Sequence, residues 1–117
     1  MTNLTIDALK EQAMEAYGDL HDRDTRHLHW NSNWMSAHEL SSFLAEAIPS
    51  YENFDGQAVA DVIRELTAYD FCVGREYSVV IYVRCADGVD GLKKVFQDLH
   101  ADEIDIQENG ALRVWWD

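Results

Sequence analysis

The sequence is short of the residues that mark several common protein classes. It has one proline, six glycines and two cysteines in 117 residues. Two cysteines cannot build a disulfide framework or a four-cysteine zinc site, so we expect a reducing, cytoplasmic setting. No Pro/Gly/Ser-rich linker, repeat or low-complexity segment divides the chain, and we predict a single acidic domain covering residues 1–117.

Long apolar runs are also missing. Nothing approaches the roughly 18 consecutive apolar residues of a membrane span. Residues 1–7 lack the basic region and the apolar run of a secretory signal, so we expect neither insertion nor export. The apolar fraction of 47% is ordinary for a globular domain and excludes wholesale disorder.

Positive charge is scarce. Nine Lys and Arg stand against 22 Asp and Glu, which gives a formal net charge of −13 at pH 7. Nucleic acids and anionic lipids are polyanions, so this charge disfavours direct binding to either. The expected partner is a basic protein surface.

Apolar residues that recur every three or four positions predict three N-terminal helices. They cover residues 6–20, 36–48 and 57–69. Ser36 and Glu39 have the spacing of a capping box at the start of the second helix. Residues 21–34 have neither a helical nor a strand period and are predicted to form an ordered loop or a short irregular element.

The second half of the chain is richer in β-branched and aromatic residues. It predicts a short strand at 71–73, a strand at 77–85 whose odd-numbered residues face the core, and a helix at 89–100. The fold class is therefore α+β. We predict three N-terminal helices followed by strand-helix-strand-strand, with a small mixed sheet of three or four strands and a C-terminal β-hairpin.

The register of that hairpin can be argued from its turn. A three-residue loop, with Gly110 left-handed at a bulge, pairs Ile106 with Leu112. The same register sets Asp105 opposite Arg113, which is a favourable cross-strand ion pair.

Four acids in the first predicted helix recur every fourth residue, namely Asp7, Glu11, Glu15 and Asp19. On a helix each step advances about 6 Å and turns about 40°, so the carboxylates form one slowly winding row. Like charges at this spacing destabilise a helix. The row approximates one edge of a phosphate backbone and predicts a partner-binding surface, although a merely solvated acidic face remains the alternative.

The hairpin supplies further candidates. Neighbouring residues of a strand face opposite sides, so Trp115 lies with Asp105 and Arg113 while Trp116 enters the core. An exposed aromatic ring among carboxylates is typical of protein interfaces. Asp105, Glu108 and Trp115 therefore join the partner-binding candidates, unless a helix covers that face and buries Trp115.

A histidine-rich segment is the main candidate for a different chemistry. Imidazole and carboxylate groups suit zinc, iron or manganese, but their spacing here matches no recognised ligand motif. The candidate ligands are His21, Asp24, His27, His29 and His38.

No catalytic signature accompanies these residues. The chain has no nucleophile elbow and no glycine-rich phosphate loop. Cys72 and Cys85 lie on or beside predicted strands and are interpreted as structural thiols. We expect no enzyme activity and no cofactor.

In size, charge and lack of catalytic motifs, the chain resembles the small acidic inhibitors that phages and plasmids direct against host nucleic-acid enzymes. These include antirestriction proteins, anti-CRISPR proteins and nuclease inhibitors. The resemblance implies a non-enzymatic nucleic-acid mimic that occupies the nucleic-acid-binding surface of a host enzyme or effector complex. Two alternatives remain open: a metal-binding protein or small hydrolase using residues 21–38, and an immunity or antitoxin-like protein that binds a cognate partner.

Overall fold

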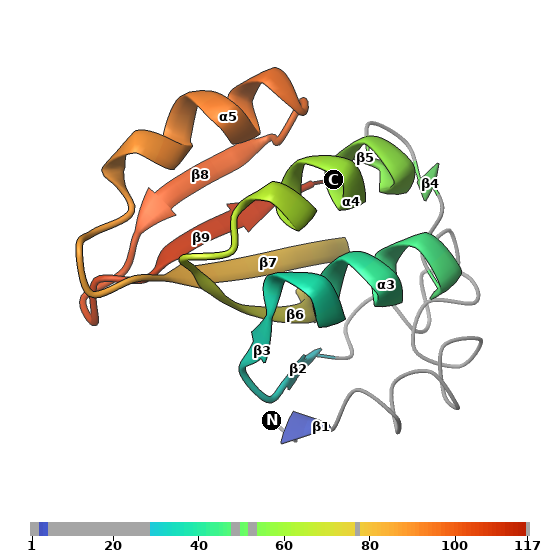
Figure 1. Ribbon diagram of the computed structural model, residues 1–117, viewed down its shortest axis with the longest axis horizontal. Helices are drawn as coiled ribbons and strands as arrows, with labels where there is room; N and C mark the ends of the chain where they lie inside the picture. Colours follow the sequence, from blue (N-terminus) through green and yellow to red (C-terminus); the bar gives the residue numbers. More distant parts are fainter. Residues whose placement is uncertain (1–2, 5–28, 48–49, 52–53, 77, 117) are drawn as a thin grey trace.

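The computed structural model describes residues 3–4, 29–47, 50–51, 54–76 and 78–116. Strands and helices alternate along this part of the chain (Figure 1). The elements are β1 (Asn3–Leu4), β2 (His29–Ser32), β3 (Met35–Ser36), α3 (Ala37–Ala47), β4 (Ser50–Tyr51), β5 (Phe54–Asp55), α4 (Gly56–Glu65), β6 (Asp70–Glu76), β7 (Ser78–Arg84), the 3-10 helix η1 (Asp90–Leu92), α5 (Lys93–Asp98), β8 (Glu103–Ile106) and β9 (Leu112–Trp115).

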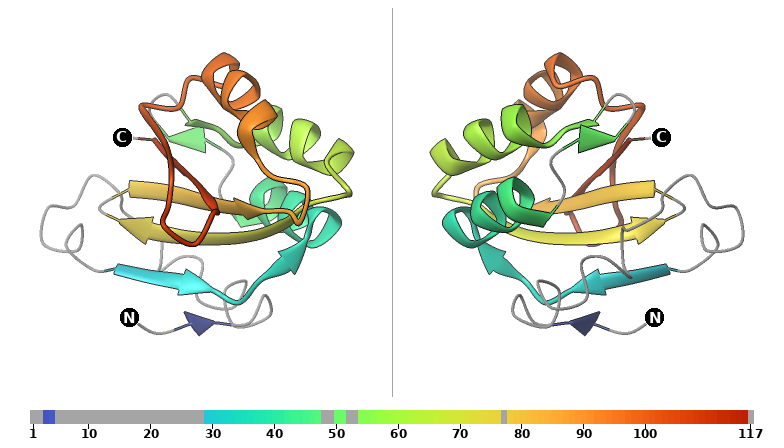
Figure 2. Two further views of the ribbon diagram at one scale, coloured as in Figure 1. Left: turned by 90° about the vertical axis from the view of Figure 1, so that its left-hand side faces the viewer. Right: turned by 90° about the vertical axis from the view of Figure 1, so that its right-hand side faces the viewer.

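The main sheet has the strand order β1-β2-β6-β7-β9-β8, and β3 pairs with β6 beside β2. Among the described strands, β1 and β2 pair in parallel and all other pairings are antiparallel. Figure 2 shows β1 at the bottom of each view, with β2, β6 and β7 above it. The strands β4 and β5 form a separate two-stranded ladder.

The core lies between one face of this sheet and the helices. The strands contribute alternate side chains such as Val73, Ile81 and Val114, all fully buried. From the helices, Phe43 of α3 and Ile63 of α4 enter the same cluster. Removing these apolar groups from water is the main favourable term that holds the layers together.

Local signals in the sequence set the helix starts. Ser36 Oγ accepts a hydrogen bond from the Glu39 N–H at 3.2 Å, and Glu39 Oε1 accepts from the Ser36 N–H at 3.1 Å. The predicted capping box is therefore confirmed. Asp55 caps α4 by accepting from the N–H groups of Gln57 and Ala58, each at 3.1 Å.

The predicted fold class was wrong in its order of elements and in its sheet. Helices are interleaved with strands instead of preceding them, and the main sheet is larger and mostly antiparallel. Residues 29–32 form β2 within the segment 21–34 where an ordered loop or short irregular element was expected, and Met35–Ser36 form β3 just before α3. Pairing with β6 imposes an extended backbone that the local sequence does not signal. The predicted helix at 6–20 lies outside the described residues.

The hairpin prediction was confirmed. Ile106 pairs with Leu112, Asp105 pairs with Arg113, and Gly110 is left-handed with φ 87°. The two strands that flank α5 in sequence, β7 and β8, are not neighbours in the sheet, because β9 lies between them.

Among the described residues, no helix is both long enough and apolar enough to cross a lipid bilayer.

Candidate functional site

The side of the main sheet that faces away from the helices carries most of its polar side chains. We call this side the outer face. Strand alternation assigns to it Cys72, Gly74 and Glu76 of β6, Ser78, Val80, Tyr82 and Arg84 of β7, Arg113 and Trp115 of β9, and Glu103 and Asp105 of β8.

Arg113 is the centre of an ion-pair network on the outer face. Its Nε lies 3.2 Å from Glu76 Oε1, and its Nη1 lies 3.0 Å from Glu103 Oε1 and 3.4 Å from Asp105 Oδ2. The Arg113 side chain is only 16% exposed. Burial alone would lower its pKa, but hydrogen bonds and charge from Glu103, Glu76 and Asp105 outweigh burial and raise the pKa above its usual value.

Glu76 joins this network to two aromatic residues. The Tyr82 hydroxyl donates to Glu76 Oε2, and the Trp115 indole N–H donates to the Glu76 backbone carbonyl at 2.7 Å. Burial and the adjacent Glu76 carboxylate both raise the pKa of Tyr82. The arrangement fixes β6, β7 and β9 to one another on the outer face.

We expect Tyr82 to ionise well above the ordinary tyrosine range in an alkaline titration of the folded protein, because burial and the Glu76 carboxylate raise its pKa. A pKa raised above the ordinary value of about 10 means that the neutral phenol stabilises the fold fully below pH 10, and that this stabilisation is lost at higher pH. Ultraviolet difference absorbance of tyrosinate measures the titration, and Tyr82→Phe should remove absorbance only at strongly alkaline pH. Loss of tyrosinate absorbance near pH 10 in the folded Tyr82→Phe variant would contradict the assignment.

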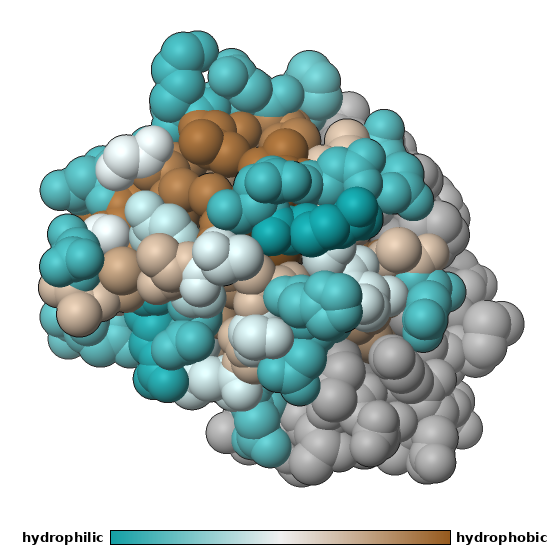
Figure 3. Space-filling view, viewed as in Figure 1, coloured by the Kyte–Doolittle hydropathy of each residue, from teal (hydrophilic) through white to brown (hydrophobic). Residues whose placement is uncertain are grey.

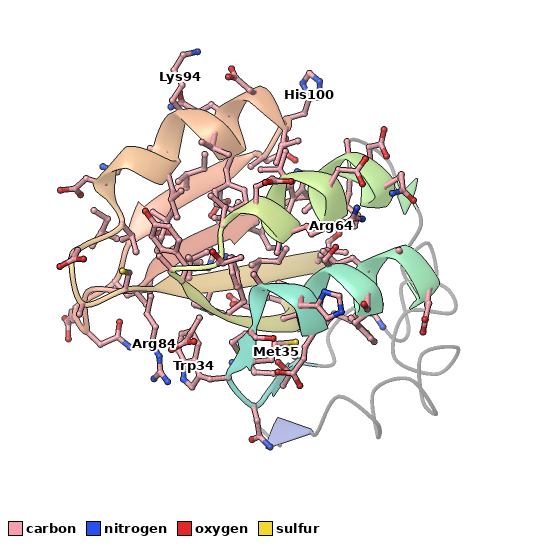
Figure 4. All side chains as sticks on the ribbon, in the orientation of Figure 1. Trp34, Met35, Arg64, Arg84, Lys94 and His100 are labelled. Atoms are coloured by element: carbon pink, nitrogen blue, oxygen red, sulfur yellow. The ribbon has the colours of Figure 1, made fainter. Side chains whose placement is uncertain are left out.

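A second group lies beside the network, below the sheet in Figure 4. The Arg84 guanidinium carbon is 4.1 Å from the ring centroid of Trp34, and Arg84 Nε is 3.6 Å from Asp70 Oδ2. Next to this stack is an open hollow of about 430 Å³. Its lining residues are Asn31, Ser32, Asn33, Trp34, Cys72, Tyr82 and Asn109.

The third group is the strand β8 with its flanking turns. In the described part of the sheet β8 is the last strand, paired with β9 on one side. Its exposed acids are Asp102, Glu103, Asp105 and Glu108. Ile106 points to the opposite side of β8 and is 43% exposed. The β8 edge of the described sheet thus combines carboxylates, an exposed apolar side chain and backbone groups that no neighbouring described strand pairs with.

The predicted partner-binding residues fall into two sets. Asp105 and Glu108 are exposed, while Trp115 is half-buried with its indole N–H bonded to Glu76. In the described chain, no helix covers this indole. Four other predicted residues lie outside the described residues, namely Asp7, Glu11, Glu15 and Asp19.

The predicted metal ligands also divide into described and undescribed residues. His38 is exposed on α3 and His29 belongs to β2, whereas His21, Asp24 and His27 lie outside the described residues. Where residues are described, no group of three or more His, Cys, Asp or Glu side chains could hold a metal ion. Cys72 is buried, and burial raises the pKa of its thiol.

Sequence reasoning missed the group of Glu76, Tyr82 and Arg113, and it did not single out Asn33. The mixed character of the even-numbered residues in 77–85 was a usable signal, since it marks a strand face that does not enter an apolar core. The cross-strand contact between Tyr82 and Arg113 requires the pairing of β7 with β9, which is not visible in local sequence.

Comparison of the chain with protein-family models, with curated proteins and with solved structures gave no match.

Proposed function

We propose that this protein is a non-enzymatic inhibitor that docks on a basic protein surface, of the kind that normally holds nucleic acid. The observation that carries the proposal is how unequally the two signs of charge are displayed. Of the fourteen acids in the described ranges, thirteen are exposed: Glu39, Glu46, Asp55, Asp61, Glu65, Asp70, Asp87, Asp90, Asp98, Asp102, Glu103, Asp105 and Glu108.

The bases of the same ranges are mostly neutralised. Arg75 is buried, and Arg64, Arg84, Lys94 and Arg113 each form an ion pair with a carboxylate. An approaching protein therefore meets an anionic surface. Such a surface accelerates association with a cationic partner and repels nucleic acid and anionic lipid.

The β8 edge is the best described candidate for the centre of this docking surface. Its exposed carboxylates, two of which also pair with Arg113, can bind Lys and Arg side chains that otherwise hold phosphates, while exposed Ile106 provides apolar contact. Partly buried Leu66 after α4, Val95 of α5 and Ile104 of β8 pack against the core on the helix side, and Figure 3 shows an apolar area between α5 and α4. Apolar contact beside charge is the usual composition of a specific interface.

A competing role for the same acids is protection of the edge. Charged side chains on an edge strand discourage pairing with another copy of the chain. The two roles make different predictions, because protection acts on self-association and docking acts on a different protein.

We expect neutralising four acids at the β8 edge to weaken partner capture by at least tenfold. The variant carries Asp102→Asn, Glu103→Gln, Asp105→Asn and Glu108→Gln, which changes the net charge from −13 to −9. A matched control makes the same charge change elsewhere, with Glu46→Gln, Asp61→Asn, Glu65→Gln and Asp87→Asn. Affinity capture from the host, compared at low and high salt, measures the difference.

A third variant neutralises Asp7, Glu11, Glu15 and Asp19 and tests the predicted acidic row. Equal weakening by all three variants would indicate non-specific attraction and contradict a defined docking surface. Self-association of the β8-edge variant, with capture unchanged, would assign these acids to edge protection. Thermal unfolding of each variant checks that the fold is retained.

We also infer that the protein acts in a reducing cytoplasm. Cys72 and Cys85 are both free thiols, and neither takes part in a disulfide. Recovery of both thiols in the native protein extracted under acid-quenched, alkylating conditions tests this inference.

A further inference from the structure

The hollow on the outer face is formed by segments far apart in sequence. The connection between β2 and β3 supplies Asn33 and Trp34, and the turn between β8 and β9 supplies Asn109. Cys72 and Tyr82 come from the central strands. The volume of about 430 Å³ lies within the range of small-molecule sites, roughly 300–1,000 Å³.

Several of the lining side chains are already engaged within the protein, including Tyr82 with Glu76 and one face of the Trp34 ring with Arg84. Cys72 Sγ donates to the Ser32 carbonyl at 3.0 Å. Ser32 Oγ donates to the Asn33 carbonyl at 2.8 Å and accepts from the Val73 N–H at 3.0 Å. These bonds fix the floor of the hollow and leave the side-chain amides as its adaptable polar groups.

The amides are only partly satisfied. Asn109 Oδ1 accepts from the Ala111 N–H at 3.0 Å. Asn31 Oδ1 is buried and has no hydrogen-bond partner among the residues with described side chains. A buried acceptor without a donor costs free energy, so a ligand that lets this amide reorient and pair would be favoured.

The lining contains no charged side chain. A charged ligand group would therefore gain no ion pair from the lining, and the neighbouring Arg84 is already paired with Asp70. Trp34 and Tyr82 add flat aromatic surface. The lining thus suits a neutral, flat ligand whose edge carries both hydrogen-bond donors and acceptors.

We propose that this hollow binds a free nucleobase or nucleoside. A carboxamide can pair with an adjacent donor and acceptor on a base edge, as Asn does with adenine. Aromatic side chains stack on the face of any base. A base within a nucleic acid strand is disfavoured, because the net charge of −13 repels its phosphates. This proposal does not depend on the inhibitor function.

The test is an NMR titration of the full chain with adenosine, guanosine, cytidine and uridine, each added separately. For at least one nucleoside we expect shifts in the side-chain amide signals of Asn33 and Asn109 and in the indole N–H signal of Trp34. The indole signal of buried Trp116 should not move. The corresponding nucleoside monophosphate should bind more weakly than the nucleoside.

Variants locate the binding. Trp34→Ala should weaken nucleoside affinity about tenfold, which corresponds to loss of one base–aromatic stack. Asn33→Ala removes an exposed amide and should weaken affinity about fivefold. His38→Ala, on exposed α3 surface, is the control and should leave affinity unchanged.

Three results would overturn the proposal. The first is the absence of shifts with all four nucleosides. The second is equal binding of a methyl glycoside, which would assign the hollow to sugars. The third is unchanged affinity in both Trp34→Ala and Asn33→Ala while their thermal unfolding matches that of the parent protein.

Discussion

Trp116→Ala should lower the free energy of unfolding by about 3–5 kcal/mol, the usual cost of truncating a fully buried tryptophan. Trp116 is completely buried and packs edge-on against two phenylalanines, with ring centroids 4.9 Å from Phe54 and 6.2 Å from Phe96. Its indole N–H also donates to the Leu99 carbonyl at 3.0 Å. One side chain thus connects the end of β9 to α5 and to the β5–α4 region.

Urea unfolding followed by far-ultraviolet circular dichroism measures this loss. Trp116→Phe keeps an aromatic ring but loses the hydrogen bond to Leu99. We expect it to lower the free energy of unfolding by about 1–3 kcal/mol. Trp34→Ala is the matched control, because Trp34 is 37% exposed and its contact with Arg84 contributes about 0.5–1 kcal/mol. Equal losses for Trp116→Ala and Trp34→Ala would contradict the assigned core.

Local chemistry made several elements predictable. The Ser36 and Glu39 pair marks a helix start through contacts three residues apart, and the alternation around Gly110 sets a hairpin register within ten residues. In each case the interacting residues are close in sequence. The predictions and the structure therefore agree at this level.

Interactions between distant segments explain the errors. Strand β6 extends through Gly74 and Arg75, which do not resemble strand interior residues, because β2 and β7 pair with it on both sides. Residues 29–32 and 35–36 form strands because they pair with β6. A single helix was predicted at 89–100. In the structure Gly91 falls within a short 3-10 turn, and only Lys93–Asp98 form an α-helix.

The candidate site illustrates the same limit. The pair of Asp105 and Arg113 was predictable because the hairpin brings its own residues together. Glu76 is 37 residues away from Arg113 in sequence, and its contact depends on the order β6-β7-β9. The hollow also requires residues from the β2–β3 connection to approach the β8–β9 turn.

Arg113→Met should destabilise the protein by about 2–4 kcal/mol at neutral pH, although methionine replaces much of the side-chain volume. The variant leaves the carboxylates of Glu76, Glu103 and Asp105 without their shared cation. Glu103 and Asp105 are more than half exposed, so water screens them and their share of the loss is small. Most of the loss comes from Glu76, which is 23% exposed and accepts a hydrogen bond from Tyr82.

A double-mutant cycle separates lost charge pairing from lost packing. Glu76→Gln removes the least exposed carboxylate that Arg113 pairs with, so Arg113→Met should cost less in a Glu76→Gln background than in the parent protein. Urea unfolding of the two single variants and the double variant at pH 7 measures this coupling. Lys94→Met is the control, because Lys94 and Asp98 form an exposed pair whose loss costs about 0.5 kcal/mol or less. An Arg113→Met loss that is the same in both backgrounds would assign the Arg113 effect to packing and remove the electrostatic role of its pair with Glu76.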